Sequence, residues 1–233
     1  MQNYSEWVEG QIKLANALAS GSCGGTYADG AIILCTTISA MTSLMWIEKD
    51  KTDRKRFIEI LVRFSQDVYD TTKVAIPIMA QDQQDCDLWH KKLKVSHKAF
   101  CYTGRDDKPE TEIISLCGHL DVRECKKFVR KYSYACLLYE QVRCGFVHTY
   151  RPGAFATEGD VLASLFDRGN AGISYVNYLA SEGMRKIFFP LGWVSEVVKN
   201  VAAGMDRECA HIGKSFPENL DLPVPTIWWI EGA

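Results

Sequence analysis

The sequence predicts a mainly α-helical protein with a small β element in its C-terminal third. The 233 residues fit one domain, or one domain with a sizeable insertion. Apolar residues make up 47% of the chain and charged residues 24%, which is the balance of a soluble globular protein. Through most of residues 1–151, large apolar side chains recur at steps of three and four positions, the spacing of one helix face.

Two helices are predicted before residue 50. Large apolar residues in helical register predict a first helix up to Ser20 (Trp7, Ile12, Leu14 and Leu18). The glycine-rich segment GSCGGT then breaks the chain. A second helix, from about residue 29 to residue 47, is apolar nearly all round, so we expect it at the centre of the fold. Its apolar stretch is shorter than the roughly 20 residues that a membrane span needs, which favours a buried helix.

The next part of the chain gives a clear helix and then weaker signals. Thr52 or Asp53 predicts the cap of a third helix, in which apolar residues recur through residues 57–64. Residues 88–93 indicate a further short helix. The polar, proline-containing stretch 102–112 is expected to be an exposed loop.

The longest predicted helix ends at a proline. Its apolar residues alternate at steps of four and three through about six turns (Phe128, Tyr132, Ala135, Tyr139, Val142 and Phe146). The sequence Arg151-Pro152-Gly153 is a strong stop signal.

After residue 153 the character of the chain changes. Residues 172–179 and 185–191 are rich in β-branched and aromatic residues, which predicts a small hairpin. A helix is expected from about residue 191 to residue 209, followed by a tail packed on the body. We expect one domain over residues 1–233, with about 154–233 as a C-terminal extension packed on the helical bundle.

Charge and cysteine content limit the classes of function. The net charge is -2, so any binding of nucleic acid must come from a local basic patch. The nine cysteines, an odd number, mostly sit in apolar or helical patterns, which is typical of buried thiols in a reducing cytoplasm. The polar, acidic N-terminal stretch lacks the pattern of a secretory signal. We expect a cytoplasmic protein with no membrane segment and no cofactor.

The stretch RCGFVHTY carries the residues most suited to chemistry. Arg143 offers a fork of donors that fits a phosphate, and His148 can take a proton from one oxygen and give it to another. Together they suit cleavage of a phosphodiester. With RNA the 2′-hydroxyl is the nucleophile, so this chemistry needs no metal.

The spacing of these two residues raises a geometric question. Five positions on an α-helix are about 140° apart around its axis, so the two side chains do not point at the same atom on one ideal helix. Either the helix loosens around Gly145 and the approaching proline, or a second subunit completes the site.

The stretch from Arg143 to Tyr150, at the end of a long helix, resembles the signature of the HEPN (higher eukaryotes and prokaryotes nucleotide-binding) superfamily. The resemblance implies a helical bundle that forms a homodimer, and metal-independent endoribonuclease activity that leaves a 2′,3′-cyclic phosphate. It implies Arg143 and His148 as the catalytic pair, with Cys144 next to the arginine and Tyr150 as a residue open to modification. It also implies a setting in toxin–antitoxin or phage-defence systems, with an antitoxin or defence-system protein as a partner.

A basic stretch upstream on the same predicted helix is a candidate RNA-binding surface, because clustered cations bind phosphate backbones. Its cations, with one that follows the motif, are Lys126, Lys127, Arg130, Lys131 and Arg151. A solvated helix face has the same composition.

Three other interpretations remain open. The first is a non-catalytic helical module that binds a nucleotide or a protein, with Cys144 as the mark of a decayed site. The second is zinc binding by Cys117, His119 and Cys125, or with His97 and Cys101, although the spacings are irregular. The third is a Cys144–His148 nucleophilic pair, which shares a helix face but has no visible orienting group.

Overall fold

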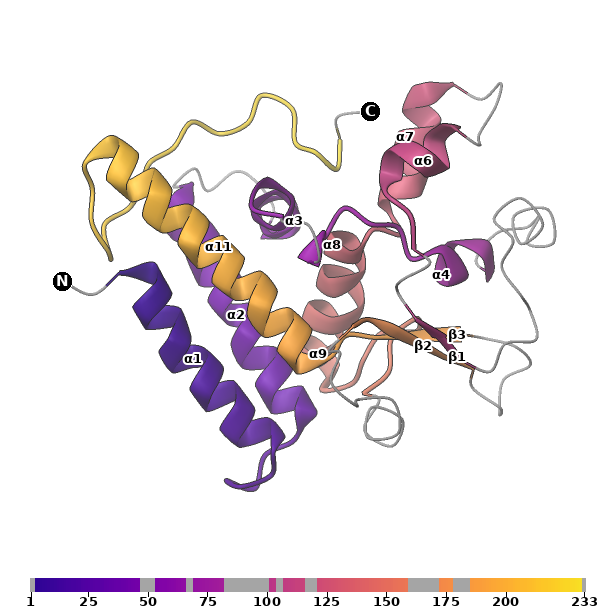
Figure 1. Ribbon diagram of the computed structural model, residues 1–233, viewed down its shortest axis with the longest axis horizontal. Helices are drawn as coiled ribbons and strands as arrows, with labels where there is room; N and C mark the ends of the chain where they lie inside the picture. Colours follow the sequence, from indigo (N-terminus) through magenta and orange to yellow (C-terminus); the bar gives the residue numbers. More distant parts are fainter. Residues whose placement is uncertain are drawn as a thin grey trace.

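The computed structural model is mainly helical, with a small antiparallel sheet at one end (Figure 1). The structure describes residues 3–46, 53–65, 69–81, 107–115, 121–158, 172–176 and 185–231, and the backbone alone of 101–103 and 177. The predicted short helix at residues 88–93 lies outside these residues. The helices and strands, in chain order, are α1 (Tyr4–Ala19), α2 (Tyr27–Met45), α3 (Asp53–Arg63), α4 (Ile76–Gln81), β1 (Cys101–Thr103), α6 (Glu110–Ser115), α7 (Val122–Arg130), α8 (Tyr134–Leu137), η3 (Leu138–Arg143), α9 (Cys144–Thr149), β2 (Ser174–Asn177), β3 (Arg185–Phe188) and α11 (Leu191–Ile212).

The helices α1, α2 and α11 pack side by side and confirm three of the predicted helices (Figure 1). Asn3 caps α1, because its side chain accepts a hydrogen bond from the backbone N–H of Glu6 (2.7 Å). Thr26 and Asp29 form a capping box at the start of α2. The chain therefore marks its first two helix starts with local polar side chains.

Helix α2 is the central element, as its apolar character predicts. It contacts α1, α11, α3, η3 and α9, and its buried side chains include Leu34, Ile38 and Met41. By length and hydropathy alone it could span a membrane, and it is the one such helix in the part of the chain that the structure describes. In this fold its apolar residues are largely covered by neighbouring helices.

The predicted long helix before residue 151 is wrong as a single element. Helix α7 ends at Arg130, and a new helix starts at Tyr134 with Ser133 as its N-cap. The chain segment just before α4 is hydrogen-bonded to the break between these helices, where the N–H of Ala75 donates to the carbonyl of Tyr132 (2.8 Å). Backbone bonds to another part of the chain replace helical bonds here, which no local pattern reveals.

The sheet confirms the predicted hairpin and adds a strand. Strand β2 pairs antiparallel with β3, with Tyr175 opposite Ile187, and β1 pairs antiparallel with the other edge of β2. The expectation of an exposed loop over residues 102–112 is wrong in part: residues 108, 109, 111 and 112 are exposed, but the stretch also holds the end of β1, the start of α6 and the buried Asp107.

Asp107 joins the sheet to the helices. Its carboxylate accepts hydrogen bonds from the hydroxyls of Tyr134 and Tyr175 and from the N–H of Ile76 (3.1 Å). Burial raises the pKa of this carboxyl to about 7, despite those donors.

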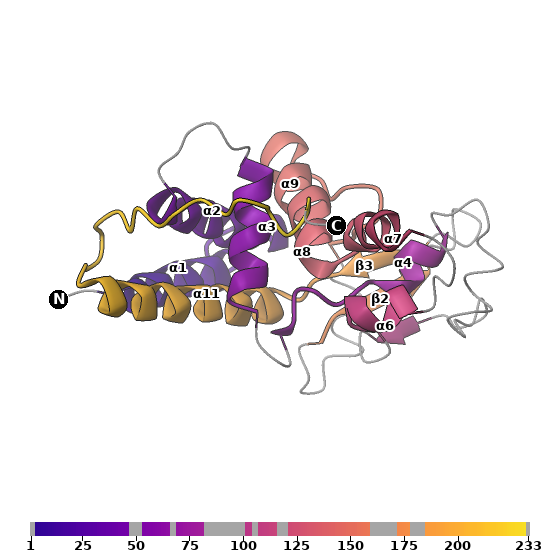
Figure 2. The same cartoon turned by 90° about the horizontal axis from the view of Figure 1, so that it is seen from above.

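The chain after α11, residues 214–231, crosses the helices as an irregular strap, which agrees with the expected packed tail (Figure 2). The N–H groups of Leu220 and Leu222 donate to carbonyls at the end of α2. Trp228 is 2% exposed and packs edge-on against Trp46, with ring centroids 5.5 Å apart.

The cysteines differ in part from the expectation of buried thiols. Cys35, Cys136 and Cys209 are free and buried, but Cys23 is exposed. Cys125 is disulfide-bonded.

Candidate functional site

The motif lies on one continuous helix whose middle is widened. The segments α8, η3 and α9 follow without a gap, and η3 is a π-helix that ends at Arg143. A π-helical turn inside an α-helix is rare and occurs frequently at functional sites. His148 sits in the last turn of α9, and Tyr150 ends it with a left-handed backbone (φ 54°).

The chain after the motif folds back tightly onto this helix. The N–H of Gly153 donates to the carbonyl of Gln141 in η3 (2.7 Å), and the Gln141 side chain accepts from the N–H of Phe155 (3.0 Å). A side chain at Gly145 would place its Cβ 2.5 Å from the carbonyl oxygen of Arg151. The two glycines of the motif region therefore allow close contact between the helix and the returning chain.

Arg143 is held inside its own chain. Its Nη2 lies 2.7 Å from Oδ2 of Asp53 at the start of α3, and its guanidinium stacks over the Tyr139 ring at 5.3 Å. The side chain is 18% exposed, and its Nε is buried without a hydrogen-bond partner. The Tyr139 hydroxyl also donates to Asp53 (3.4 Å), and burial raises its pKa to about 12. The Nη2 group of Arg143 is therefore engaged by Asp53, whereas its Nε donates to no partner.

His148 is exposed to solvent on α9. No hydrogen bond connects it to Arg143 among the described residues, and the segment between them is α-helical. The π-helix η3 ends at Arg143 and α9 follows it, so the residues between Arg143 and His148 keep α-helical spacing. The single chain does not bring the predicted pair together on one atom.

Tyr150 and Cys144 have structural neighbours. The Tyr150 hydroxyl lies 3.3 Å from Oγ1 of Thr26, and hydrogen bonds from Tyr150 and Thr26 lower the pKa of Asp29. Tyr150 is still 50% exposed. Cys144 is a free, half-buried thiol close to Arg143 and to Cys35, whose pKa burial raises to about 12.

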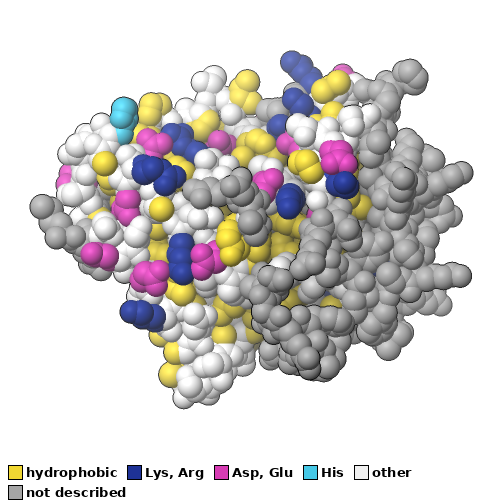
Figure 3. Space-filling model, in the orientation of Figure 1, with side chains coloured by type: hydrophobic (Ala, Val, Ile, Leu, Met, Phe, Trp, Pro, Cys, Tyr) yellow, Lys and Arg dark blue, Asp and Glu magenta, His cyan; other side chains and the backbone are white. Residues whose placement is uncertain are grey.

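The predicted RNA-binding cations fall into two groups. Lys127, Lys131 and Arg151 are exposed and Lys126 is half-buried. On the face drawn in Figure 3, Lys and Arg side chains are spread over several elements, with a few close together at the upper edge. Arg130 is different, because it is 7% exposed and forms an ion pair with Glu110 (2.8 Å). It stabilises packing and is not part of the exposed basic surface.

Metal ligands do not gather in the described residues, where no three His, Cys, Asp or Glu side chains form a cluster. The cysteine and histidines proposed as zinc ligands with Cys125, namely Cys117, His119 and His97, lie outside the described residues.

Sequence reasoning missed Asp53 and Tyr139 as neighbours of Arg143. Tyr139 shares its helix four positions earlier, so helical spacing was a usable signal. Asp53 comes from a helix distant in sequence, and no local signal links the two residues.

No known protein-family model matches the chain, and comparisons with curated proteins and with solved structures give no match either.

Proposed function

We propose that the chain is a metal-independent endoribonuclease of the HEPN type, active as a cytoplasmic homodimer. The observation that carries the proposal is the placement of Arg143 at the end of a π-helical turn, followed by an exposed His148 and a half-exposed Tyr150 at the helix end. Rare helix geometry beside a histidine–arginine motif favours a functional site over a chance pair of surface residues.

The proposed reaction needs only this pair and the RNA. His148 takes the proton of the ribose 2′-hydroxyl, whose oxygen attacks phosphorus and forms the new P–O2′ bond. The P–O5′ bond breaks, and the leaving 5′ oxygen receives a proton from an imidazolium. Arg143 binds a non-bridging oxygen and stabilises its developing charge. The products are a 2′,3′-cyclic phosphate and a 5′-hydroxyl.

A second copy completes the proposed site. Arg143, at the end of η3, and His148 in α9 are five positions apart, which is about 140° around a helix axis, so one chain offers each residue to a different side. A two-fold dimer brings two such helix ends together and sets an arginine of one chain opposite a histidine of the other. An antitoxin or defence-system protein that covers α9 would then control access.

The test compares two exposed histidines. We expect the purified parent to cleave RNA in the presence of a chelator and to leave cyclic phosphate ends. His148→Ala should lower the rate by at least about a hundredfold, since general acid–base catalysis contributes that much or more. His211→Ala, an exposed histidine at the end of α11, should cut at the parent rate. Equal rates for parent and His148→Ala would reject the assignment.

One observation favours a second candidate, a non-catalytic helical module that binds a nucleotide or protein. Asp53 occupies one end of the Arg143 fork within the same chain, which is what a structural arginine requires. In this case the parent leaves RNA intact at every concentration, while capture of the partner survives loss of both Arg143 and His148.

A further inference from the structure

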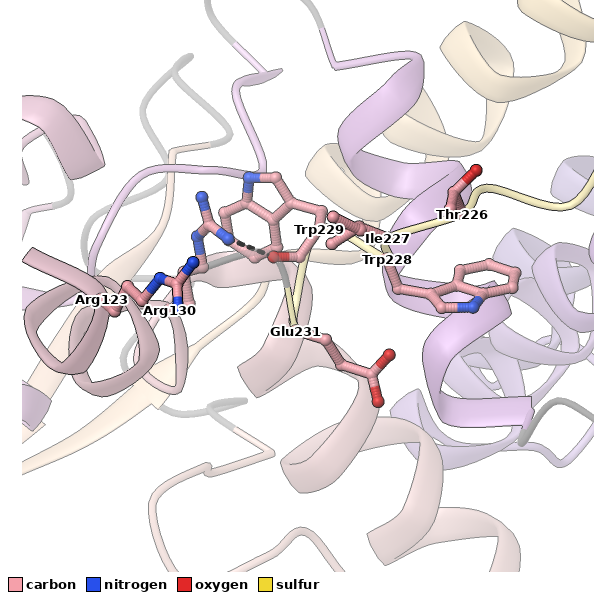
Figure 4. A pocket seen from close by; sticks show the side chains of 7 residues that line it. All are labelled: Arg123, Arg130, Thr226, Ile227, Trp228, Trp229 and Glu231. Atoms are coloured by element: carbon pink, nitrogen blue, oxygen red, sulfur yellow. Dashed lines mark hydrogen bonds between the residues drawn. The ribbon is translucent and has the colours of Figure 1, made fainter.

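A groove of about 710 Å³ lies between α7 and the C-terminal strap (Figure 4). Arg123 and Arg130 reach it from α7, and the strap supplies the remaining lining residues, which are Thr226, Ile227, Trp228, Trp229 and Glu231. It is separate from α9 and from the motif residues.

Internal contacts of Arg130 build the walls of this groove. Its guanidinium pairs with Glu110, donates to the carbonyl of Trp229 and stacks over the Trp229 ring at 4.6 Å. The N–H of Trp229 donates to Glu59 of α3 (2.7 Å), and Lys55 pairs with Glu231. These contacts hold the strap against α7 and α3. The two ion pairs also neutralise Glu110 and Glu231.

Arg123 and Ile227 are the groups left for a ligand. Within the described residues, the Arg123 guanidinium has no ion-pair partner, and its side chain is exposed. Ile227 is 68% exposed, the most exposed large apolar residue described, and Trp229 beside it is half-buried. A free cation therefore lies next to an apolar surface that includes part of an indole ring.

Further cations extend this surface toward the motif helix. Lys127 is exposed on α7, and Lys131 lines a smaller cavity of about 190 Å³ together with Arg54. That cavity also touches Glu140 and Gln141 of η3. Glu140 pairs with Arg54 there (2.6 Å), so the exposed Lys127 and Lys131 are the cations that add to the charge of Arg123.

We propose that this groove binds a single-stranded nucleic acid, with a phosphate on Arg123 and a base against Ile227 and Trp229. An unpaired strand offers alternating phosphates and flat base faces, whereas a duplex hides its base faces in the stack. The exposed cations Arg123, Lys127 and Lys131 recur at steps of four along α7 and its C-cap, which favours a polyanion over a peptide with one acidic group. The proposal does not require Arg143 and His148 to be catalytic.

The test measures binding without cleavage. Full-length protein is titrated into a fluorescent 2′-O-methyl oligouridine of about 12 nucleotides at about 50 mM salt, followed by anisotropy. Arg123→Glu should weaken binding at least about fivefold and lower the salt slope by about 1. Ile227→Ser should weaken it severalfold at an unchanged slope.

Matched controls carry the same changes elsewhere. Arg207→Glu alters an exposed arginine on α11, and Leu14→Ser an apolar residue of α1 that is 46% exposed; both should bind like the parent. A DNA oligomer of the same length shows whether the 2′-position contributes. The 2′-O-methyl oligomer lacks the 2′-hydroxyl that the proposed cleavage needs, so loss of cleavage and loss of binding are separable.

Three results would overturn the proposal. The first is no binding by the parent at low salt. The second is equal weakening by Arg123→Glu and Arg207→Glu. The third is groove-dependent binding of an acidic, aromatic peptide in place of the oligomers, which would assign the groove to a protein partner.

Discussion

At the scale of single residues, Arg143 serves two demands. Asp53 and the Tyr139 ring hold it from within the chain, and the proposed chemistry needs its remaining donors for a phosphate. A guanidinium has five N–H donors and the ion pair with Asp53 engages Nη2, so the two uses are compatible if a phosphate binds the other terminal nitrogen. Asp53 then fixes the direction in which the free side of the fork points.

The ion pair predicts a measurable coupling. Unfolding free energies of Arg143→Ala, Asp53→Ala and the double variant should give an interaction of about 1–2 kcal/mol, because the pair is partly buried and its charged atoms lie 2.7 Å apart. The exposed Lys108–Glu112 pair is the control cycle and should give less than about 0.5 kcal/mol. A coupling as small as that of the control would mean that the bond does not hold Arg143 in solution.

At the scale of elements, the motif helix and its return loop form one unit. The π-turn and Gly145 and Gly153 bring the chain back across the helix, with Gln141 bonded on both its backbone and its side chain. Thr149 adds a bond from its hydroxyl to the carbonyl of Gly145 (2.8 Å). This unit sets where His148 and Tyr150 stand.

Substitution of Gly145 tests the close contact. Alanine normally stabilises a helix interior relative to glycine, but here its Cβ would meet backbone atoms of the return loop. We expect Gly145→Ala to lower the free energy of unfolding by about 1–3 kcal/mol in urea titrations. Gly10→Ala in α1 has no atom within 4 Å of the new Cβ and should raise it by about 0.5–1 kcal/mol. Stabilisation by both changes would show that the loop yields easily.

The spacing of apolar residues predicted the helices that bury one apolar face. It failed where backbone hydrogen bonds from a distant part of the chain interrupt a helix. Helices α1, α2 and α11 and the β2–β3 hairpin follow from local patterns. The break at Ser133 depends on bonds from residues 71–75, and the π-turn has no recognised sequence signal. Of the candidate site, the sequence alone picks out the motif residues, whereas the Asp53 contact requires the folded chain.

At the scale of the whole molecule, Asp107 links the sheet to the helical body. Tyr175 comes from β2, Tyr134 from α8 and Ile76 from α4, and all three donate to one carboxyl group. Two charged side chains act on this cluster: Lys73 lowers the pKa of Asp107, and Asp70 raises the pKa of Tyr134. Desolvation exceeds these effects.

The raised pKa of Asp107 predicts a pH dependence of stability. The unfolded carboxyl titrates near 3.8 and the folded one near 7, so the folded state binds the extra proton between these values. Stability from this group is full below pH 3.8 and is lost as pH rises through about 7, by at most about 1.4 kcal/mol per pH unit. Urea titrations at pH 5 and pH 8 should show a fall for the parent and a smaller fall for Asp107→Asn. Equal falls would place the effect elsewhere.

The strap and α11 cover α2, and this has a consequence for synthesis. Trp46, at the end of α2, packs against the ring of Trp228, which is among the last residues to be synthesised. Helix α11, which packs on α2, starts only at Leu191. On the ribosome, the apolar helix α2 can pack early on α1 and α3, but the cover that α11 and the strap provide is absent until nearly the whole chain has been translated. Until then the nascent chain exposes apolar surface that chaperones can bind. The speed of translation over the last third of the chain sets how long that surface is exposed to aggregation.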